Sequence, residues 1–209
     1  MFASVCPKEI SLSAVGASMP SLVKTPQQPM SLDYTIRKAI LEDKPALERL
    51  IALSVLALCA PDYTAEQIEG ALRGAFGVDT DLIRDGTYFV AETNKELIGC
   101  GGWSKRKTFL GGDRRTARDA DVLDPRHDAA KIRAFFTHPN RARRRIAKAI
   151  LTRCEDEARA HGFRALELMA ALPGLRFYAA LGFAGSEPVN HELTPGLVTP
   201  FVLMKKLLV

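Results

Sequence analysis

The stretch Phe135–Leu151, with the sequence FFTHPNRARRRIAKAIL, joins an apolar strand to an amphipathic helix through a short basic loop. The strand pattern ends at His138-Pro139, and the helical spacing of apolar residues begins near Ile146. A loop of this kind brings backbone N–H groups and cations to the N-terminus of a helix, where the helix dipole also attracts negative charge. It predicts a binding site for a phosphate or pyrophosphate, and hence a phosphorylated cofactor.

Four arginines fall between Asn140 and Ile146. Cations at a helix N-terminus are unfavourable against its dipole unless an anion binds there, so the phosphate interpretation is preferred over an ordinary helix start with solvated basic residues. Nucleic-acid binding through Arg141–Arg145 is a third interpretation. It is weakened because no aromatic residues alternate with the basic ones, as they do in single-strand-binding surfaces.

The chain has 209 residues, 47% of them hydrophobic, and a formal net charge of +5, which suits one domain with a sizeable core and an anionic partner. We expect residues 1–30, rich in Ser, Pro and Gln, to be a disordered extension, and residues 31–209 to be a single domain. The four cysteines are scattered, which favours buried free thiols and a cytoplasmic location. The sequence lacks a zinc-ligand spacing and an apolar run of the roughly 18 residues that a membrane span needs, so we expect neither metal nor membrane.

Hydrophobic periodicity divides the domain into strands and helices. It predicts strands at 33–40, 87–92, 97–103, 129–137, 164–170, from 183 onward and at 201–207. It predicts helices at 43–61, 64–77, 145–161 and 173–181, the second of which opens with the capping box Thr64-Ala65-Glu66-Gln67. Residues 104–128 form a long polar loop, which in a compact domain is either functional or disordered. The order β-α-α-β-β-β-α-β-α-β-β indicates an α/β domain of the mixed α+β kind.

Two motifs carry a family resemblance. Residues 142–147 read ARRRIA, close to the pattern (Arg/Gln)-x-x-Gly-x-(Gly/Ala), and residues 177–183 read FYAALGF, an aromatic-Tyr-x-x-x-Gly-Phe helix end. Residues 129–183 thus resemble the core of the GNAT superfamily of N-acetyltransferases, and the element order of 33–209 is similar to that of the family. The resemblance implies a mixed, mostly antiparallel sheet of six to seven strands, splayed between the fourth and fifth strands and flanked by about four helices. Arg145 stands where the family usually has Gly, and Ala142 lacks the long polar side chain often found there.

The resemblance also implies a function: transfer of the acetyl group of acetyl-CoA, the co-substrate, to a primary amine of a small molecule or peptide by direct attack. The pyrophosphate is then expected on the loop and first helical turn, at Ala142, Arg143, Arg144, Arg145, Ile146, Ala147 and Lys148. Pantetheine is expected to pair like an added strand with the main chain of Phe135, Phe136 and Thr137. A backbone N–H near Phe136 would stabilise the oxyanion.

Tyr178, in the second motif, is the candidate acid that protonates the leaving thiolate, since a phenol of reference pKa about 10 suits a thiol of about 8.5. Glu167 interrupts an apolar strand and is the candidate general base, with Glu92 and His138 as weaker alternatives. The acceptor side is expected from the first two helices, the 104–128 loop and the last two strands. The alternative function is a non-catalytic GNAT-fold sensor that only holds CoA. The acceptor and the oligomeric state, monomer or homodimer, stay open.

Overall fold

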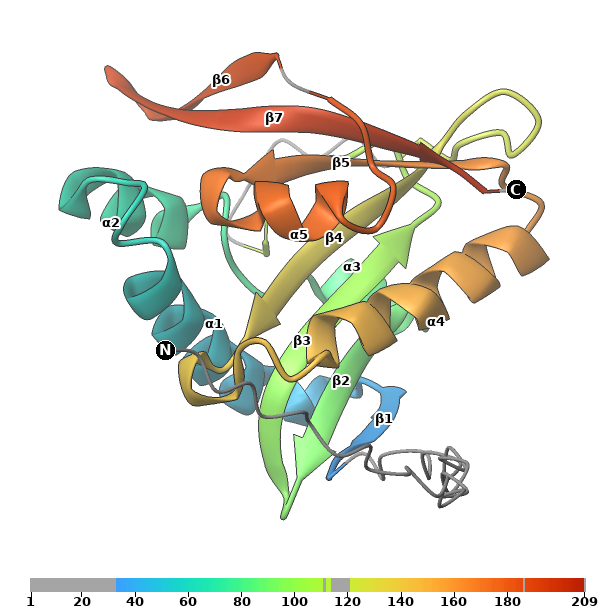
Figure 1. Cartoon of the computed structure of the whole chain (residues 1–209), viewed down its shortest axis with the longest axis horizontal. Helices are drawn as coiled ribbons and strands as arrows, with labels where there is room; N and C mark the ends of the chain where they lie inside the picture. The colour runs from blue at the N-terminus through green and yellow to red at the C-terminus, as the bar shows by residue number, and fades with distance from the viewer. Residues whose placement is uncertain (1–32, 111, 114–120, 186, 209) are drawn as a thin grey trace, which may run out of the picture. The chain divides into compact units, whose positions relative to one another are not determined.

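Seven strands form one sheet in the order β1-β2-β3-β4-β5-β7-β6 (Figure 1). The structure is a computed structural model that describes residues 33–110, 112–113, 121–185 and 187–208. The predicted extension at 1–30 and part of the 104–128 loop lie outside these residues. The strands are β1 Thr35–Lys38, β2 Tyr88–Thr93, β3 Glu96–Ser104, β4 Ala130–Thr137, β5 Ala165–Ala171, β6 Pro188–Thr194 and β7 Leu197–Leu207.

The sheet is antiparallel throughout except between β4 and β5, which run parallel. These two strands pair only at Ala130–Leu166 and Lys131–Glu167, and beyond that point they diverge (Figure 1). The predicted mixed sheet with its splay is therefore confirmed. At Ala134 the φ angle is 54° and the register against β3 shifts, which marks a β-bulge. The divergence leaves the β5-facing edge of β4 open from Ile132 onward.

In the described part of the chain, five α-helices pack on the sheet: α1 Lys44–Leu58, α2 Ala65–Arg73, α3 Thr80–Arg84, α4 Ile146–Ala160 and α5 Leu175–Ala179. The helices α4 and α5 cover one face, and α1, α2 and α3 cover the other (Figure 1). The predicted capping box opens α2: Thr64 Oγ1 accepts the Gln67 N–H, and Gln67 Oε1 accepts the Thr64 N–H. Two expectations were wrong. The second helix ends at Arg73 instead of continuing to Gly77, and α3 was not predicted.

The two faces of the sheet carry separate cores. On the α4 side, Trp103 is fully buried and its indole N–H donates to Glu157 at 3.0 Å. On the other side, Leu47 and Ile51 of α1 belong to the same buried cluster as Tyr88 of β2. Cys59, Cys100 and Cys154 are free and buried, as predicted. The core positions follow the helical and alternating patterns of the sequence, which is why the element types could be read from it.

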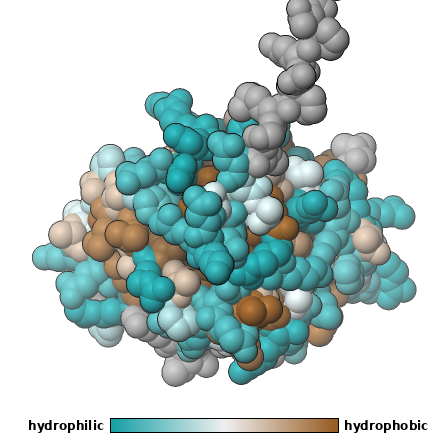
Figure 2. All heavy atoms as spheres, turned by 90° about the horizontal axis from the view of Figure 1, so that it is seen from below, coloured by the Kyte–Doolittle hydropathy of each residue, from teal (hydrophilic) through white to brown (hydrophobic). Residues whose placement is uncertain are grey.

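The surface seen from below is mostly hydrophilic, with hydrophobic residues gathered on the side where α1 and α2 lie (Figure 2). Leu53 and Leu56 of α1 are half exposed and belong to the apolar surface of this helix. No helix in the described part of the chain combines the length and the apolar character that crossing a bilayer requires.

Candidate active site

A cavity of about 610 Å³ lies where β4 and β5 diverge, within the range of roughly 300–1,000 Å³ typical of small-molecule sites. Its walls come from both faces of the sheet, because the splay lets the cavity pass between the two strands. It brings together every predicted site residue except Arg144 and Glu167. The predicted residues that line it are Phe135, Phe136, Thr137, Ala142, Arg143, Arg145, Ile146, Ala147, Lys148 and Tyr178.

One end of the cavity is formed by the basic loop and the start of α4. Within the described residues, no protein group accepts a hydrogen bond from the backbone N–H groups of residues 143–148, and the first such bond is that of Ala149 to Arg145 at 3.0 Å. The helix can approach the sheet closely because β3 has Gly99 at the contact, where a Cβ would lie 2.5 Å from Ile146 Cγ2. Unsatisfied amides at a helix N-terminus, flanked by exposed cations, form an anion-binding site.

Arg145 adopts the backbone conformation that a glycine prefers. It precedes α4 with φ 63° and ψ 8°, in the left-handed region, and no side chain caps the helix. Arg143 also has φ 63°. The loop therefore keeps a glycine-type geometry although neither residue is glycine, at a cost of about 1 kcal/mol or more for each position. The backbone N–H groups of residues 143–148 remain without a protein acceptor within the described residues. The presence of Arg145 instead of glycine therefore changes the strain of the loop more than its shape.

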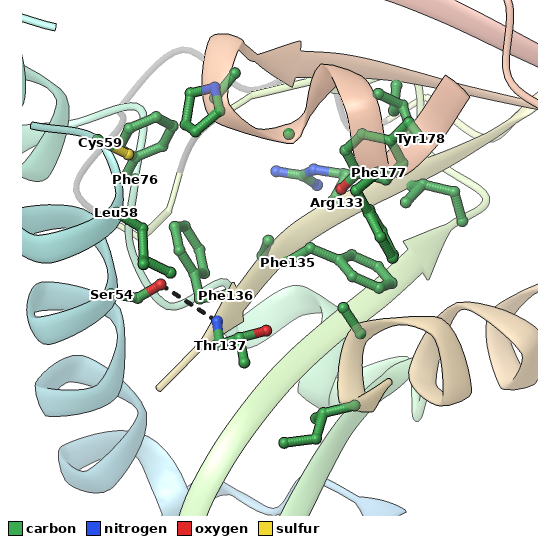
Figure 3. Close-up of a pocket in the computed structure, with 18 of the residues that line it drawn as sticks. Ser54, Leu58, Cys59, Phe76, Arg133, Phe135, Phe136, Thr137, Phe177 and Tyr178 are labelled. Carbon is green, nitrogen blue, oxygen red and sulfur yellow. Dashed lines mark hydrogen bonds between the residues drawn. The ribbon is translucent and has the colours of Figure 1, made fainter. Parts of the chain in front are cut away.

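Tyr178 lies on α5, in the wall of the same cavity. Its ring packs edge-on against Phe135, Phe177 and Phe183, with centroids 6.4, 5.0 and 5.6 Å away. The hydroxyl points toward the cavity (Figure 3) and has no hydrogen-bond partner among the described residues. Burial is the main cause that raises the pKa of Tyr178 above its ordinary value, with nearby Cys154 adding to it. The phenol therefore stays protonated and available as a donor.

None of the three candidate bases lines the cavity, although His138 directly follows the lining residue Thr137. Glu167 forms an ion pair with the buried Lys131, and it does not line the cavity. Glu92 lies on β2, two strands away from β4 in the sheet, and pairs with Arg37 at 2.8 Å. His138 Nδ1 accepts the Asn140 N–H at 3.2 Å. The base role of Glu167 stays a prediction, and this geometry gives it no support.

Two features of the site were missed by sequence reasoning. Ser54 of α1 accepts a hydrogen bond from the Thr137 N–H at 3.2 Å (Figure 3), so this amide, expected to pair with pantetheine, already has a partner. Arg133 of β4 lines the cavity and forms a buried ion pair with Asp79, Nη2 to Oδ2 at 2.7 Å. No local pattern reveals either pair, because the partners are 83 and 54 positions apart in the chain.

The remaining wall is apolar and comes from several segments. Leu58 and Cys59 come from the end of α1, and Ala75, Phe76 and Gly77 from the segment after α2. Phe109 and Leu110 come from the loop after β3. Met169, Ala171 and Pro173 come from β5 and the turn that follows it. No described residue of β6 or β7 lines it, so the expected contribution of the last two strands to the acceptor side stays a prediction that this cavity does not support. These strands support the wall from behind, where Phe201 packs edge-on against Phe76 at 5.9 Å. Within the described ranges, no three His, Cys, Asp or Glu side chains gather as metal ligands.

A mixed sheet splayed between β4 and β5, with the N-terminus of α4 at the splay, is the arrangement of the GNAT fold. The family model "Acetyltransferase (GNAT) family" matches residues 54–183, more than half of the chain. The chain therefore belongs to the GNAT acetyltransferase family, as the two motifs indicated. No curated protein matches the sequence.

Solved structures share this fold at low sequence identity. A GCN5-related N-acetyltransferase from Rhodopseudomonas palustris has a TM-score of 0.60 and 18% identity, over 83% of this chain and 94% of its own. The PaiA N-acetyltransferase from Thermoplasma acidophilum, in complex with coenzyme A, has a TM-score of 0.57 and 18% identity, over 83% and 98%. The structure of yncA from Salmonella typhimurium, with its cofactor acetyl-CoA, has a TM-score of 0.55 and 18% identity, over 85% and 95%.

Proposed function

We propose that this protein is an N-acetyltransferase that moves the acetyl group of acetyl-CoA to a primary amine by direct attack. The observation that carries the proposal is a single cavity joining the free amides of residues 143–148 to the Tyr178 hydroxyl along the open edge of β4. Structures of the same fold hold coenzyme A or acetyl-CoA. Buried free thiols at Cys59, Cys100 and Cys154 suit a reducing compartment such as the cytoplasm.

In this proposal the diphosphate of acetyl-CoA accepts hydrogen bonds from the loop and first-turn amides, and the guanidinium groups around them add attraction. The residues assigned to this grip are Ala142, Arg143, Arg144, Arg145, Ile146, Ala147 and Lys148. The pantetheine arm extends along Phe135 and Phe136, whose β5-facing main-chain edge lies beyond the last β4–β5 pair. Because Ser54 already accepts from the Thr137 N–H, the arm either bonds upstream of Thr137 or displaces that contact.

The chemistry is one addition and one elimination. The amine nitrogen attacks the thioester carbon, and the oxyanion that forms accepts a hydrogen bond from a main-chain N–H near Phe136. The C–S bond then breaks, Tyr178 donates a hydrogen bond to the leaving thiolate, the new amide nitrogen loses its proton to solvent, and the thiolate takes up a proton from solvent. Burial keeps Tyr178 protonated but also makes complete proton transfer to a thiolate of reference pKa about 8.5 uphill. Hydrogen bonding to the developing thiolate is then the main contribution of the phenol.

The test measures CoA binding and acetyl transfer separately. Calorimetry gives the affinity for CoA, and release of free thiol from acetyl-CoA in the presence of amines gives the transfer rate. Tyr178→Phe removes only the hydroxyl, so we expect CoA affinity to stay within about twofold while kcat falls about 10²- to 10³-fold, the usual loss when one hydrogen-bond donor to a developing negative charge is removed. If calorimetry detects no heat of binding with either CoA or acetyl-CoA, the proposal loses its basis.

The second candidate is a CoA-binding module without transfer activity. The observation in its favour is that no carboxylate or imidazole belongs to the described cavity lining, so no conventional base faces the thioester. This candidate predicts CoA binding with no amine-dependent thiol release, and with no difference between the wild type and Tyr178→Phe.

A further inference from the structure

We assign the acceptor to the half of the cavity on the α1–α3 side of the sheet, because the basic loop and α4 lie on the other side, and this acceptor half is apolar. On the α1–α3 side of the sheet its walls are formed mainly by aliphatic, aromatic and sulfur-containing side chains, namely Leu58, Cys59, Phe76, Phe109, Leu110 and Met169. Polar groups of a substrate would lose their water here without finding partners, which is costly. The lining thus favours an acceptor that is itself apolar next to its amine.

The charges that face this cavity are positive or absent. Among the described lining residues, the titratable groups are the Cys59 thiol from α1, the Arg133 guanidinium from β4 and the Tyr178 phenol from α5. Farther along, toward the phosphate end, stand Arg141, Arg143, Arg145 and Lys148. Neither the thiol nor the phenol ionises near neutral pH, because burial raises both pKa values, that of Cys59 to about 11. The described lining contains no Asp, Glu or His.

Three acids lie close to residues of the cavity wall: Asp79, Glu167 and Asp62. Asp62 is exposed and lies outside the lining, although its charge helps to raise the pKa of the Cys59 thiol, whereas the other two are paired with cations. Asp79, which is 1% exposed, pairs with Arg133 and also accepts the Asp81 N–H at the start of α3. Glu167 pairs with Lys131, whose ammonium also stands 4.0 Å over the ring of Phe109. Phe109 itself belongs to the cavity wall, so this ion pair stands behind the wall. An ammonium ion that enters the cavity meets the Arg133 cation and no free carboxylate within the described lining.

The apolar lining disfavours a charged ammonium relative to the neutral amine, and the Arg133–Asp79 pair offers it no net negative charge in compensation. The neutral amine is also the form that attacks the thioester. The two requirements are met together if the protein binds the acceptor already deprotonated, so that the ammonium proton goes to bulk water before binding and not to a side chain of the protein.

We propose that the acceptor is an apolar primary amine, such as an arylalkylamine, that enters the cavity as its uncharged free base without a protein general base. The inference rests on the proposed transferase function and specifies its substrate class. It predicts that two classes of amine are poor acceptors: polyamines, which carry further ammonium groups, and lysine side chains, which are attached to a polar peptide backbone.

The decisive measurement is the pH profile of kcat/KM for two matched apolar acceptors. Benzylamine is largely an ammonium ion at pH 7, whereas aniline is a free base there. For benzylamine we expect kcat/KM to rise about tenfold per pH unit from pH 6 to 8, following the free-base fraction, and for aniline to stay flat over the same range. A break at one shared pH for both amines would report a protein base and would overturn the inference.

Two further readouts separate this inference from the function on which it rests. In Glu167→Gln, the rise of kcat/KM with pH for benzylamine and the flat profile for aniline must both persist. Loss of the benzylamine rise in this variant would identify Glu167 as the base and overturn the inference. Spermidine serves as the charged comparison at pH 7.5, and we expect its kcat/KM to be at least tenfold below that of benzylamine. If spermidine is the better acceptor, the transferase proposal stands and the substrate class is wrong. If calorimetry detects no CoA binding, both fail.

Discussion

The strained loop before α4 gives a prediction that does not depend on the acceptor. Arg145 is exposed, and its φ of 63° lies in the left-handed region, where the Cβ of an L-residue causes steric strain. Arg145→Gly and Arg145→Ala remove the same guanidinium and differ only in that Cβ. Since an L-residue costs about 1–2 kcal/mol more than glycine in this conformation, the glycine variant should be the more stable by about 1 kcal/mol. For a chain of this size that corresponds to a melting temperature about 2–4 °C higher.

The neighbouring arginine provides the matched control. Arg144 is exposed in the same loop but is not among the residues with positive φ. There the order should reverse, with Arg144→Ala more stable than Arg144→Gly by about 0.4–1 kcal/mol, because glycine makes the unfolded chain more flexible. Urea unfolding of the four variants without CoA measures both differences. The strain argument is refuted if the glycine-minus-alanine difference has the same sign at both positions.

Three further predictions concern the cavity. Ser54→Ala leaves the Thr137 N–H without its partner and should lower the free energy of unfolding by about 1 kcal/mol, measured by urea titration. Gly101→Ala places a Cβ 2.7 Å from the ring of Phe135 and should cost about 1–3 kcal/mol, partly recovered in the double variant with Phe135→Leu. Burial raises the pKa of the Cys59 thiol to about 11, so its alkylation by iodoacetamide should be slow at pH 8. The rate, followed by mass spectrometry, should increase about tenfold per pH unit up to about pH 11. A rate that levels off by pH 9 would contradict the raised pKa.

The elements that could be predicted are those that local chemistry determines. The capping box at Thr64–Gln67 specifies where α2 begins through contacts within one turn. The hairpin between β2 and β3 turns at Asn94 and Lys95, both with positive φ, between two apolar runs that the sequence displays directly. By contrast α3 has five residues, too few to show a helical period, and its start depends on Asp79 as the N-cap. The end of α2 at Arg73 was missed because two glycines, Gly74 and Gly77, follow it closely.

The two halves of the cavity differ in the same way. The end of the cavity that we propose for the phosphates is one contiguous segment, so a motif and a helix dipole are enough to predict its residues from the sequence. The acceptor wall combines short pieces of α1, the α2–α3 segment, the loop at Phe109 and β5. Each piece reads in the sequence as ordinary core, and only the divergence of β4 from β5 turns them into the lining of a space.

The polarity of that space depends on residues whose sequence context is misleading. In β4 the alternation of Lys131 and Arg133 with apolar neighbours resembles a strand with one face in water, yet both side chains are buried. They are buried because Glu167 and Asp79, each from another element, supply the opposite charges. Each pair fixes an acid that would otherwise be a candidate base, and it is the guanidinium of Arg133 that faces the cavity. For Glu167 or Asp79 to deprotonate the acceptor, one of these pairs would have to break, at a cost of about 3–5 kcal/mol, whereas binding an amine that is already neutral requires no such change.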